Sequence, residues 1–291
     1  MAKLKSDCLN CIVKMQADKY PDDCTENQKL IYKQRVFKVL SEAKDFESAP
    51  LLIKRIADIQ TVLFGKSADY TDIKKYYNRY VMEKLPSLRK NILLSDDSLR
   101  CAMQYSLIGN FIDFGAMKTV DNNKFEQLLE KSSKIELGIE YENIRKELKQ
   151  AKRLVFLTDN CGEIVFDKAF IQTIKSLYPM ISITVIVRGQ AVLNDATIED
   201  ATEIELIDEC NVIGNGTNVA GTCLELITEQ ARQAINSADV IISKGQGNFE
   251  TLQDCGLNVY FLFMCKCEMF AKRFGVERFE GLLINDKRKE I

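Results

Sequence analysis

The run RLVFLTDNCGEIVFDKAFIQTIKSLY, residues 153–178, gives the clearest indication of the fold. Its first six residues are mostly apolar and β-rich, and residues 163–178 repeat apolar side chains with the three-four spacing of a helix. The alternation continues as ISITVIVR, a helix around 196–202, EIELID, a helix over 222–235, DVIISK, a short helix near 249–253 and LNVYFLFM. Near-continuous apolar strands that alternate with helices predict an α/β fold with a doubly wound, mostly parallel, Rossmann-like sheet.

The residues before 151 have a different pattern. Residues 6–150 are a succession of amphipathic helical segments such as LIYKQRVFKVLSEA and LLIKRIADIQTVLFG, which predicts six to eight helices. No repeat or low-complexity linker separates the two halves. We therefore expect residues 1–150 to form a helical cap or rim packed against an α/β domain of residues 151–291 that binds metal and phosphate.

Composition and charge exclude several classes of function. The 291 residues include 40 basic and 42 acidic side chains, so no basic excess favours nucleic acid as a partner. No apolar run reaches the roughly 20 residues that a membrane span needs, and no signal peptide is evident, so we expect a cytoplasmic protein without a membrane partner. The chain contains no histidine, which excludes Ser-His-Asp catalysis and His-ligated metals. The sequence does not indicate an oligomeric state.

Polar residues follow three of the predicted strands. RLVFLT is followed by Asp159 and Asn160, ITVIVR leads to Asn194 and Asp195, and DVIIS is followed by Lys244. Ligands of open parallel sheets bind beyond the carboxyl ends of the strands, so these side chains should meet there. Any one of them alone is commonly a helix N-cap. Together, two carboxylates and an amide oxygen are hard ligands suited to Mg²⁺ or Mn²⁺, and a lysine opposite them would neutralise a phosphoryl group.

Two further segments carry candidate binding residues. The loop NGTNVAGT, residues 215–222, includes Thr217 and Thr222 and could hold phosphate or sugar hydroxyls, or could be an ordinary glycine loop with a Thr cap. In GNFIDFG, Asn110 and Asp113 are three residues apart and hence on one helical face. That face either lines the cleft opposite the sheet or is a satisfied polar pair at a helix end.

These motifs resemble the damage-control phosphatase family, long known as domain of unknown function 89. The resembling segments run in order along nearly the whole chain: Cys8-x-x-Cys11, GNFIDFG at 109–115, TDNCGEIVFD at 158–167, VLNDAT at 192–197, GTNVAGT at 216–222 and SKGQGNFETL at 243–252. The resemblance implies a metal-dependent phosphatase of the smaller, CxxC-bearing branch. Its implied substrates are small phosphate esters, such as sugar phosphates or phosphorylated damaged metabolites.

The resemblance also implies roles for particular residues. The divalent ion, with Mn²⁺ favoured and Mg²⁺, Co²⁺ or Ni²⁺ as other candidates, would be held by Asp159, Asn160 and Asp195. Lys244 would contact the substrate phosphate and completes the candidate catalytic set. The candidate substrate-binding residues are Asn110, Glu163, Asn194, Thr217 and Thr222. Cys161 stands where the family's first motif more commonly has Ala or Ser. The nucleophile, either a water activated by the ion or Asp159, is left open.

Other interpretations use the same sheet. A carboxyl methyltransferase that uses S-adenosylmethionine also has a doubly wound fold, but its first strand usually leads into a glycine-rich turn, which here is DNCGE. A haloacid-dehalogenase-type phosphatase would need Asp-x-Asp after the first strand. A non-catalytic protein would bind the ion and a phosphate ligand without turnover.

The CxxC pair is a separate feature of the N-terminal half. Cys8 and Cys11 could hold a second, structural metal, with Cys24, Cys265 and Cys267 as further thiolates. A CxxC pair on a helix can equally be ordinary packing.

Overall fold

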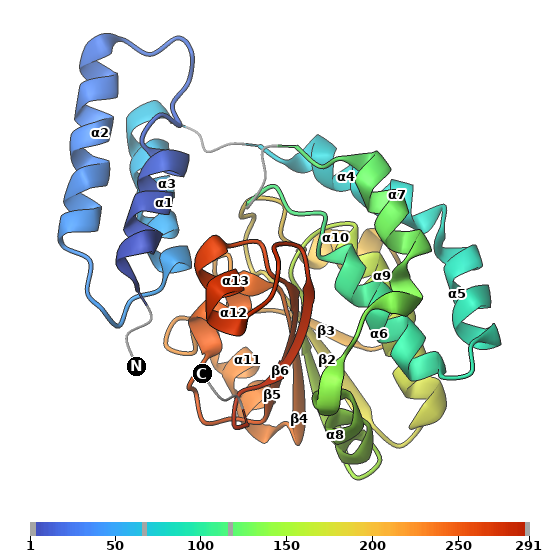
Figure 1. Cartoon of the computed structure of the whole chain (residues 1–291). Coiled ribbons are helices and arrows are strands. Elements are labelled where there is room, and N and C mark those ends of the chain that lie inside the picture. Colours follow the sequence, from blue (N-terminus) through green and yellow to red (C-terminus); the bar gives the residue numbers. More distant parts are fainter. Residues whose placement is uncertain (1–3, 66–68, 116–118, 289–291) are drawn as a thin grey trace.

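The computed structural model describes residues 4–65, 69–115 and 119–288, which form one central sheet and its covering helices (Figure 1). The strands are β1 Arg153–Leu157, β2 Ser182–Val187, β3 Asn211–Gly214, β4 Val240–Lys244, β5 Val259–Met264 and β6 Gly281–Asn285. They lie in the order β3-β2-β1-β4-β5-β6, with β6 alone antiparallel to its neighbour. The predicted doubly wound, mostly parallel sheet is therefore confirmed, and its strand order is that of Rossmann sheets.

The sheet is buried on both faces, which explains why its strands are apolar at nearly every position. Along β1, Leu154 and Phe156 belong to the hydrophobic cluster on one face, whereas Val155 and Leu157 belong to the cluster on the other. Helices α6 (Ser98–Gly109) and α9 (Glu163–Leu177) pack against each other within the first cluster. The second cluster includes α11 (Glu229–Ser237), α12 (Gln246–Leu252) and α13 (Glu268–Phe274).

The predicted strand EIELID is wrong. Helix α10 (Ile198–Glu203) ends within this segment, and the chain then turns, with Glu205 at a φ of 57° and the amide of Leu206 donating to Ala201 O at 2.8 Å. Ile204 and Leu206 are fully buried because this turn folds back under α10. Their apolar character therefore reflects a buried turn, and β3 follows at Asn211.

The predicted helix over 222–235 starts later than expected. The structure has α11 at Glu229–Ser237, and the Thr228 side chain caps it by accepting a hydrogen bond from the amide of Ala231. Residues 222–228 form turns instead, because Thr222 is held by partners outside this segment: its amide donates to Thr251 Oγ1 at 2.9 Å. The chain thus uses Thr228, and not Thr222, as the helix cap.

The N-terminal half is helical, as predicted, and the described part of it contains eight α-helices and one 3₁₀ turn. They are α1 Ser6–Gln16, α2 Glu26–Ser41, α3 Ala49–Phe64, α4 Thr71–Met82, α5 Leu85–Leu94, α6, α7 Asn122–Glu130, η1 Ser132–Lys134 and α8 Gly138–Leu148. They divide into two groups, because α1–α3 enclose a small core of their own whereas α4–α8 contribute to the large core beside the sheet. The expected division into 1–150 and 151–291 stays a prediction.

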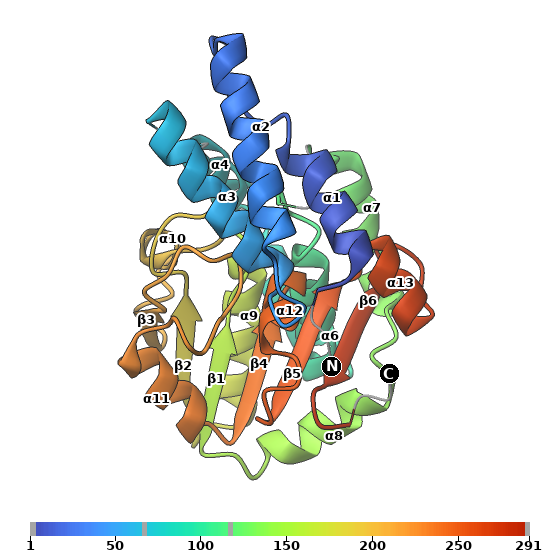
Figure 2. The ribbon, with the colours of Figure 1, turned by 90° about the vertical axis from the view of Figure 1, so that its left-hand side faces the viewer.

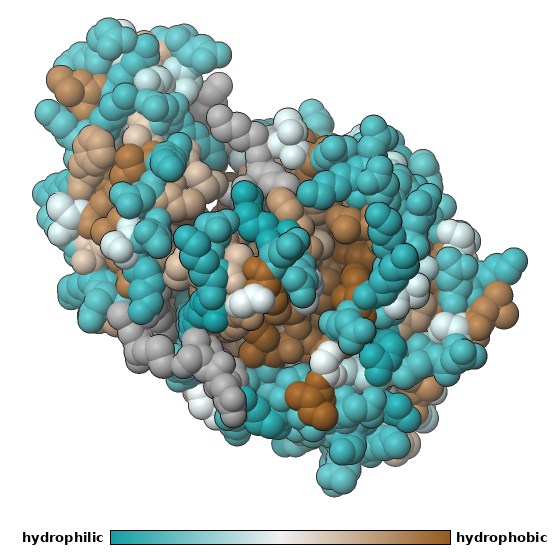
Figure 3. All heavy atoms as spheres, viewed as in Figure 1, coloured by the Kyte–Doolittle hydropathy of each residue, from teal (hydrophilic) through white to brown (hydrophobic). Residues whose placement is uncertain are grey.

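Helices α1–α3 stand at the carboxyl-end edge of the sheet. Helix α3 contacts α12, which directly follows β4, and the two views show the group projecting from the rest of the molecule (Figures 1 and 2). Hydrophilic residues cover most of one face, with hydrophobic ones gathered near its centre between α13 and α7 (Figure 3). None of the described helices combines the length and the apolar character that crossing a bilayer requires.

Candidate active site

The candidate active site lies where β1 and β4 end, at the point in the sheet where the strand order reverses. Asp159 and Asn160 come just after β1, and Asn160 forms an antiparallel bridge with Asp195. The backbone amide of Ala196 donates to Asp159 O at 2.7 Å. Backbone pairing between the two loops therefore brings the three predicted metal ligands side by side.

The carboxylate of Asp159 is buried and fixed from several sides. Its Oδ2 atom accepts from Asn160 Nδ2 at 2.7 Å and Asn110 Nδ2 at 3.1 Å, and its Oδ1 atom accepts from Arg188 Nη2 at 3.3 Å. The turn after β4 approaches closely, since a Cβ atom on Gly245 would lie 2.0 Å from Asp159 Oδ2. Gly245 also has a φ of 79°, so only glycine fits this turn without strain.

The other two predicted ligands keep an oxygen available. Asp195 accepts from Arg188 Nε through Oδ2 at 2.6 Å, and Asn160 uses its amide nitrogen to donate to Glu163 Oε2 at 3.0 Å. Within the described ranges, no hydrogen bond reaches Asp195 Oδ1 or Asn160 Oδ1. These two oxygens and the carboxylate of Asp159 are the donor types that Mg²⁺ and Mn²⁺ prefer, so the residues present fit such an ion.

Lys244 lies beside these residues but is completely buried. Its ammonium donates to Glu163 Oε1 at 2.6 Å, Asp167 Oδ1 at 2.8 Å and Ser106 O at 2.9 Å. An ammonium has three donors, and all three are used within the protein. This arrangement does not fit the expected direct contact between Lys244 and a substrate phosphate. The lysine holds Glu163 in place instead.

Arg188 is the main site residue that the sequence did not single out. It follows β2 directly, is 1% exposed, and reaches both ligand carboxylates as well as Asn248 Oδ1, to which Nη1 donates at 3.2 Å. Asn248 donates in turn to Thr158 O and Lys244 O, at the ends of β1 and β4. The available signal was a basic residue at the carboxyl end of an otherwise apolar strand.

The connected charged side chains of this site, which we call the carboxylate cluster, do not balance in formal charge. The members are the carboxylates of Asp159, Glu163, Asp167 and Asp195 and the cations Arg188 and Lys244. When every member is ionised, four negative and two positive charges leave a formal charge of −2. The neighbouring pairs are neutral, since Asp113 binds Lys266 at 2.6 Å and Asp200 binds Lys74 at 2.6 Å.

Burial and mutual repulsion change the acidity of these carboxyl groups. Burial raises the pKa of Asp195 to about 6, although Arg188 opposes the change. Burial raises the pKa of Asp159 well above its usual range, with further contributions from the charges of Asp195 and Glu163. Burial also raises the pKa of Asp167 to about 7, against the effect of Lys244. The metal-free site therefore holds protons more tightly than ordinary carboxyl groups do.

The two asparagines predicted to bind substrate lie in different settings. Asn110 is the C-cap of α6, and its Nδ2 atom donates to Glu163 Oε1 at 3.1 Å and Oε2 at 2.9 Å. Its side-chain oxygen, Oδ1, accepts from the backbone amide of Met264 at 3.0 Å. Asn110 therefore belongs to the carboxylate cluster. Asn194 is fully buried and holds the loop after α6, by donating to Ile112 O and accepting from the amide of Phe114. Its contacts support the loop and do not point to substrate.

The threonines of the loop 215–222 do not join the cluster directly. Thr222 is fully buried, and its hydroxyl donates to Asn248 Oδ1 at 2.8 Å. The hydroxyl of half-buried Thr217 donates to Asn215 Oδ1 at 3.2 Å. Thr222 therefore supports Asn248, whereas no described contact connects Thr217 with the carboxylates.

Asn110 and Asp113 do not share a helical face, and of the two interpretations the helix end with satisfied polar side chains agrees with the structure. Helix α6 ends at Gly109, where an added Cβ atom would lie 2.8 Å from Phe166 Cδ2, and the chain leaves the helix at Asn110. Asp113 instead pairs with the buried Lys266, which follows β5. The spacing of three residues could not show that Asp113 pairs with Lys266, because these two residues are far apart in the sequence.

The cysteines of the CxxC pair lie on α1, away from the carboxylate cluster. Cys8 is half-buried and Cys11 is exposed, and burial raises the pKa of both thiols, with smaller effects from the charges of Cys267 and Glu250. In the part of the chain that the structure describes, no three Cys, Asp or Glu side chains are grouped so that they could hold an ion. The second, structural metal stays a prediction.

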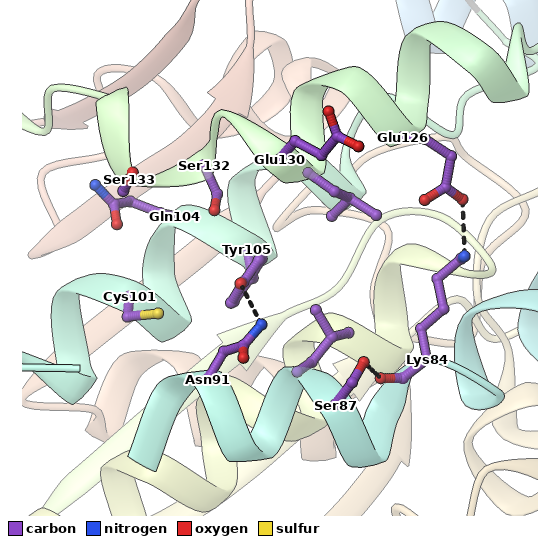
Figure 4. Close-up of a pocket in the computed structure, with 12 residues that line it drawn as sticks. Lys84, Ser87, Asn91, Cys101, Gln104, Tyr105, Glu126, Glu130, Ser132 and Ser133 are labelled. Carbon is purple, nitrogen blue, oxygen red and sulfur yellow. Dashed lines mark hydrogen bonds and ion pairs between the residues drawn. The ribbon is translucent and has the colours of Figure 1, made fainter. Parts of the chain in front are cut away.

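A pocket of about 500 Å³ lies elsewhere, between α5, α6, α7 and η1 (Figure 4). It is lined by side chains such as Asn91, which donates to Tyr105, and Lys84, which pairs with Glu126 at 2.8 Å. It shares no residue with the cluster of Asp159. This pocket and the concentration of buried charge are therefore separate features.

Known proteins resemble the chain along most of its length. A damage-control phosphatase of Archaeoglobus fulgidus is 32% identical over 241 residues, covering 80% of this chain and 82% of that protein. A damage-control phosphatase of Pyrococcus horikoshii is 28% identical over 99% of each chain. An uncharacterized protein of Methanocaldococcus jannaschii is 30% identical over 97% of this chain and 95% of its own length.

A solved structure and a family model agree with these sequence relatives. The crystal structure of a DUF89 family protein from Pyrococcus horikoshii has a TM-score of 0.79 and 25% identity, and the match covers 98% of this chain and 99% of that chain. A family model described as the damage-control phosphatase ARMT1-like domain matches residues 4–282. Because this match spans most of the sequence, the chain belongs to the damage-control phosphatase family.

Proposed function

We propose that the protein is a metal-dependent phosphatase that hydrolyses small phosphate esters, such as sugar phosphates or phosphorylated damaged metabolites. Membership of the family supports a phosphatase-type function. The observation that carries the metal dependence is the buried cluster of four carboxyl groups and two cations: when all are ionised, its formal charge is −2, which one divalent cation would neutralise. The expected cytoplasmic location stays a prediction from the sequence.

The proposed ligands are Asp159, Asn160 and Asp195, and Mn²⁺ is the favoured ion. A divalent ion held there would polarise a phosphoryl group and neutralise its developing charge, so this chemistry needs no histidine. The two available oxygens, Asp195 Oδ1 and Asn160 Oδ1, support this assignment.

The remaining residues hold the ligands in place. Asn110 donates to both Asp159 and Glu163, so it fixes the spacing between these two carboxylates. Lys244 donates to Glu163 and holds its carboxylate in place, and it supplies a positive charge near the proposed metal ligands. Asp159 is the carboxylate placed to accept a proton from the attacking water or to attack phosphorus itself, and the bound ion would favour its ionised form.

Phosphate release is the direct test. The full-length protein would be stripped with EDTA and incubated with p-nitrophenyl phosphate and a panel of sugar phosphates, with Mn²⁺, Mg²⁺, Co²⁺, Ni²⁺ or no metal. We expect release that depends on the ion and is lost in Asp195→Asn. The matched control is Asp239→Asn, since Asp239 precedes β4 at the opposite edge of the sheet.

The alternatives predict different results. A methyltransferase would bind S-adenosylmethionine and release no phosphate, and a non-catalytic binder would bind Mn²⁺ and phosphate without turnover. The proposal is wrong if folded, metal-loaded protein releases no phosphate from any substrate in the panel.

A further inference from the structure

Arg188 occupies an unusual position for an arginine. Its side chain is 1% exposed, and its guanidinium lies between the two carboxylates proposed as metal ligands. Taking a guanidinium out of water costs several kcal/mol unless its partners compensate for the lost hydration. The partners therefore indicate what the residue is for.

The contacts of Arg188 leave one oxygen of Asp195 available to a ligand. Its Nε binds Oδ2 of Asp195, and Oδ1 of that carboxylate has no hydrogen bond among the described residues. Its Nη2 reaches Asp159 Oδ1 at the longer distance of 3.3 Å. Its Nη1 donates to Asn248, which is itself bonded to the backbone ends of β1 and β4. The guanidinium is thus anchored to the rigid sheet and holds both ligands from one side.

The formal charge of the carboxylate cluster indicates why a cation is needed at this position. Without Arg188, the connected cluster would carry a formal charge of −3 in place of −2, and its only remaining cation would be Lys244. Lys244 touches neither Asp159 nor Asp195, because its donors go to Glu163, Asp167 and a backbone carbonyl. Arg188 is therefore the only cation among the described residues that directly contacts these two ligands.

We propose that Arg188 is the fixed counter-ion of the metal site: it holds Asp159 and Asp195 together in the metal-free protein and shares their neutralisation with the divalent ion. This inference rests on the proposed metal-dependent function. It makes Arg188 a positioning residue, which acts on the ion through its two ligands and is not itself a ligand.

An ordinary buried salt bridge makes a different prediction. Such a bridge would stabilise the protein by the same amount with or without metal, since no ion would replace it. Lys74 provides the matched comparison, because it is paired with buried Asp200 at 2.6 Å and contacts neither proposed ligand.

The test compares thermal unfolding of the full-length wild type, Arg188→Gln, Arg188→Lys and Lys74→Met, in EDTA and in saturating Mn²⁺. We expect Arg188→Gln to lower Tm by roughly 10 °C in EDTA, as when one partner of a buried ion pair is removed. In Mn²⁺ this deficit should shrink by at least half, because the ion supplies the missing positive charge. Lys74→Met should show similar deficits in both conditions.

Arg188→Lys separates charge from shape. It keeps the positive charge but cannot bridge three partners, so its deficit in EDTA should be smaller than that of Arg188→Gln. Equal deficits for the two variants would show that charge is not the contribution and would overturn the inference. If Arg188→Gln does not fold in EDTA, recovery in Mn²⁺ supports the inference, and failure in both conditions contradicts it.

Calorimetric titration of Mn²⁺ into the wild type distinguishes this inference from the proposed function. If the wild type binds no Mn²⁺, both the metal-dependent function and the role of Arg188 are wrong. If it binds Mn²⁺ while the deficit of Arg188→Gln is unchanged by the ion, only the role of Arg188 is wrong.

Discussion

The α1–α3 group and the carboxylate cluster both bury polar side chains, but they treat charge differently. In the helical group, Tyr32 donates to Gln16 O at 2.9 Å, and Gln60 donates to Lys19 O and Tyr32 Oη, so these buried side chains are neutral and hydrogen-bonded. The carboxylate cluster instead has a formal charge of −2 when all its members are ionised. Neutral hydrogen bonds of this kind are sufficient to stabilise a folded region. An unbalanced buried charge lowers the stability of the folded protein, and such destabilising features are kept at functional sites.

Removing a proposed ligand should have the largest effect. Asp159→Ala or Asp195→Ala should lower metal-dependent phosphate release by about a thousandfold or more, because each removes a charged ligand. Circular dichroism should show that the fold is retained, since both residues lie in loops after the strands. Near-normal activity at limiting Mn²⁺ in either variant would contradict the ligand assignment.

Removing Lys244 should mainly affect stability. In Lys244→Met, Glu163 and Asp167 would lose their buried cation, so the free energy of unfolding should fall by about 3–5 kcal/mol. Urea denaturation in EDTA measures this loss. A variant of unchanged stability would mean that the two carboxylates do not need the ammonium, and the comparison with the helical group would fail.

The affinity for Mn²⁺ should depend on pH. Because burial raises the pKa of Asp195 to about 6, an ion must displace a proton at lower pH. Calorimetry should show affinity falling by up to about tenfold per pH unit as the pH drops below about 6. The raised pKa also means that the stabilisation from protonated Asp195 is present below its ordinary value of 3.8 and is lost as the pH rises through about 6. A constant affinity between pH 5 and 7 would argue against Asp195 as a ligand.

The smallest effect is expected in the helical group. Gln60→Ala should cost about 1–2 kcal/mol of unfolding free energy, since it removes neutral hydrogen bonds to Tyr32 and Lys19 O. This loss should be the same in EDTA and in Mn²⁺, as measured by urea denaturation. A dependence on the ion would show that the two regions are coupled.

Much of the site could be predicted because its residues follow apolar strands directly. Asp159 and Asp195 were found from the rule that ligands lie beyond the carboxyl ends of parallel strands. Arg188 was missed because it was assigned to the predicted strand ITVIVR as its last residue, and only the polar residues after the strand were considered. The role expected for Lys244 changed because its burial depends on α6 and α9, whose residues are far away in the sequence.

Local pattern also failed where burial had another cause. Ile204 and Leu206 are buried in a turn and not in a strand, so their apolar spacing predicted the wrong element. Strand β6 was not predicted at all, although it completes the sheet beside β5. Periodicity reports which residues are buried, and tertiary contacts decide in what structure they are buried.

The sequence by itself determined the apolar strands, the helices between them and the polar residues at the strand ends, because these depend on short-range spacing and on which faces are buried. The tertiary structure decided the balance of charge. Lys244 meets Ser106 across 138 residues, and Arg188 meets Asn248 across 60. Such contacts depend on how distant elements pack, and Coulomb interactions in a buried site depend on distance in space and not on position along the chain.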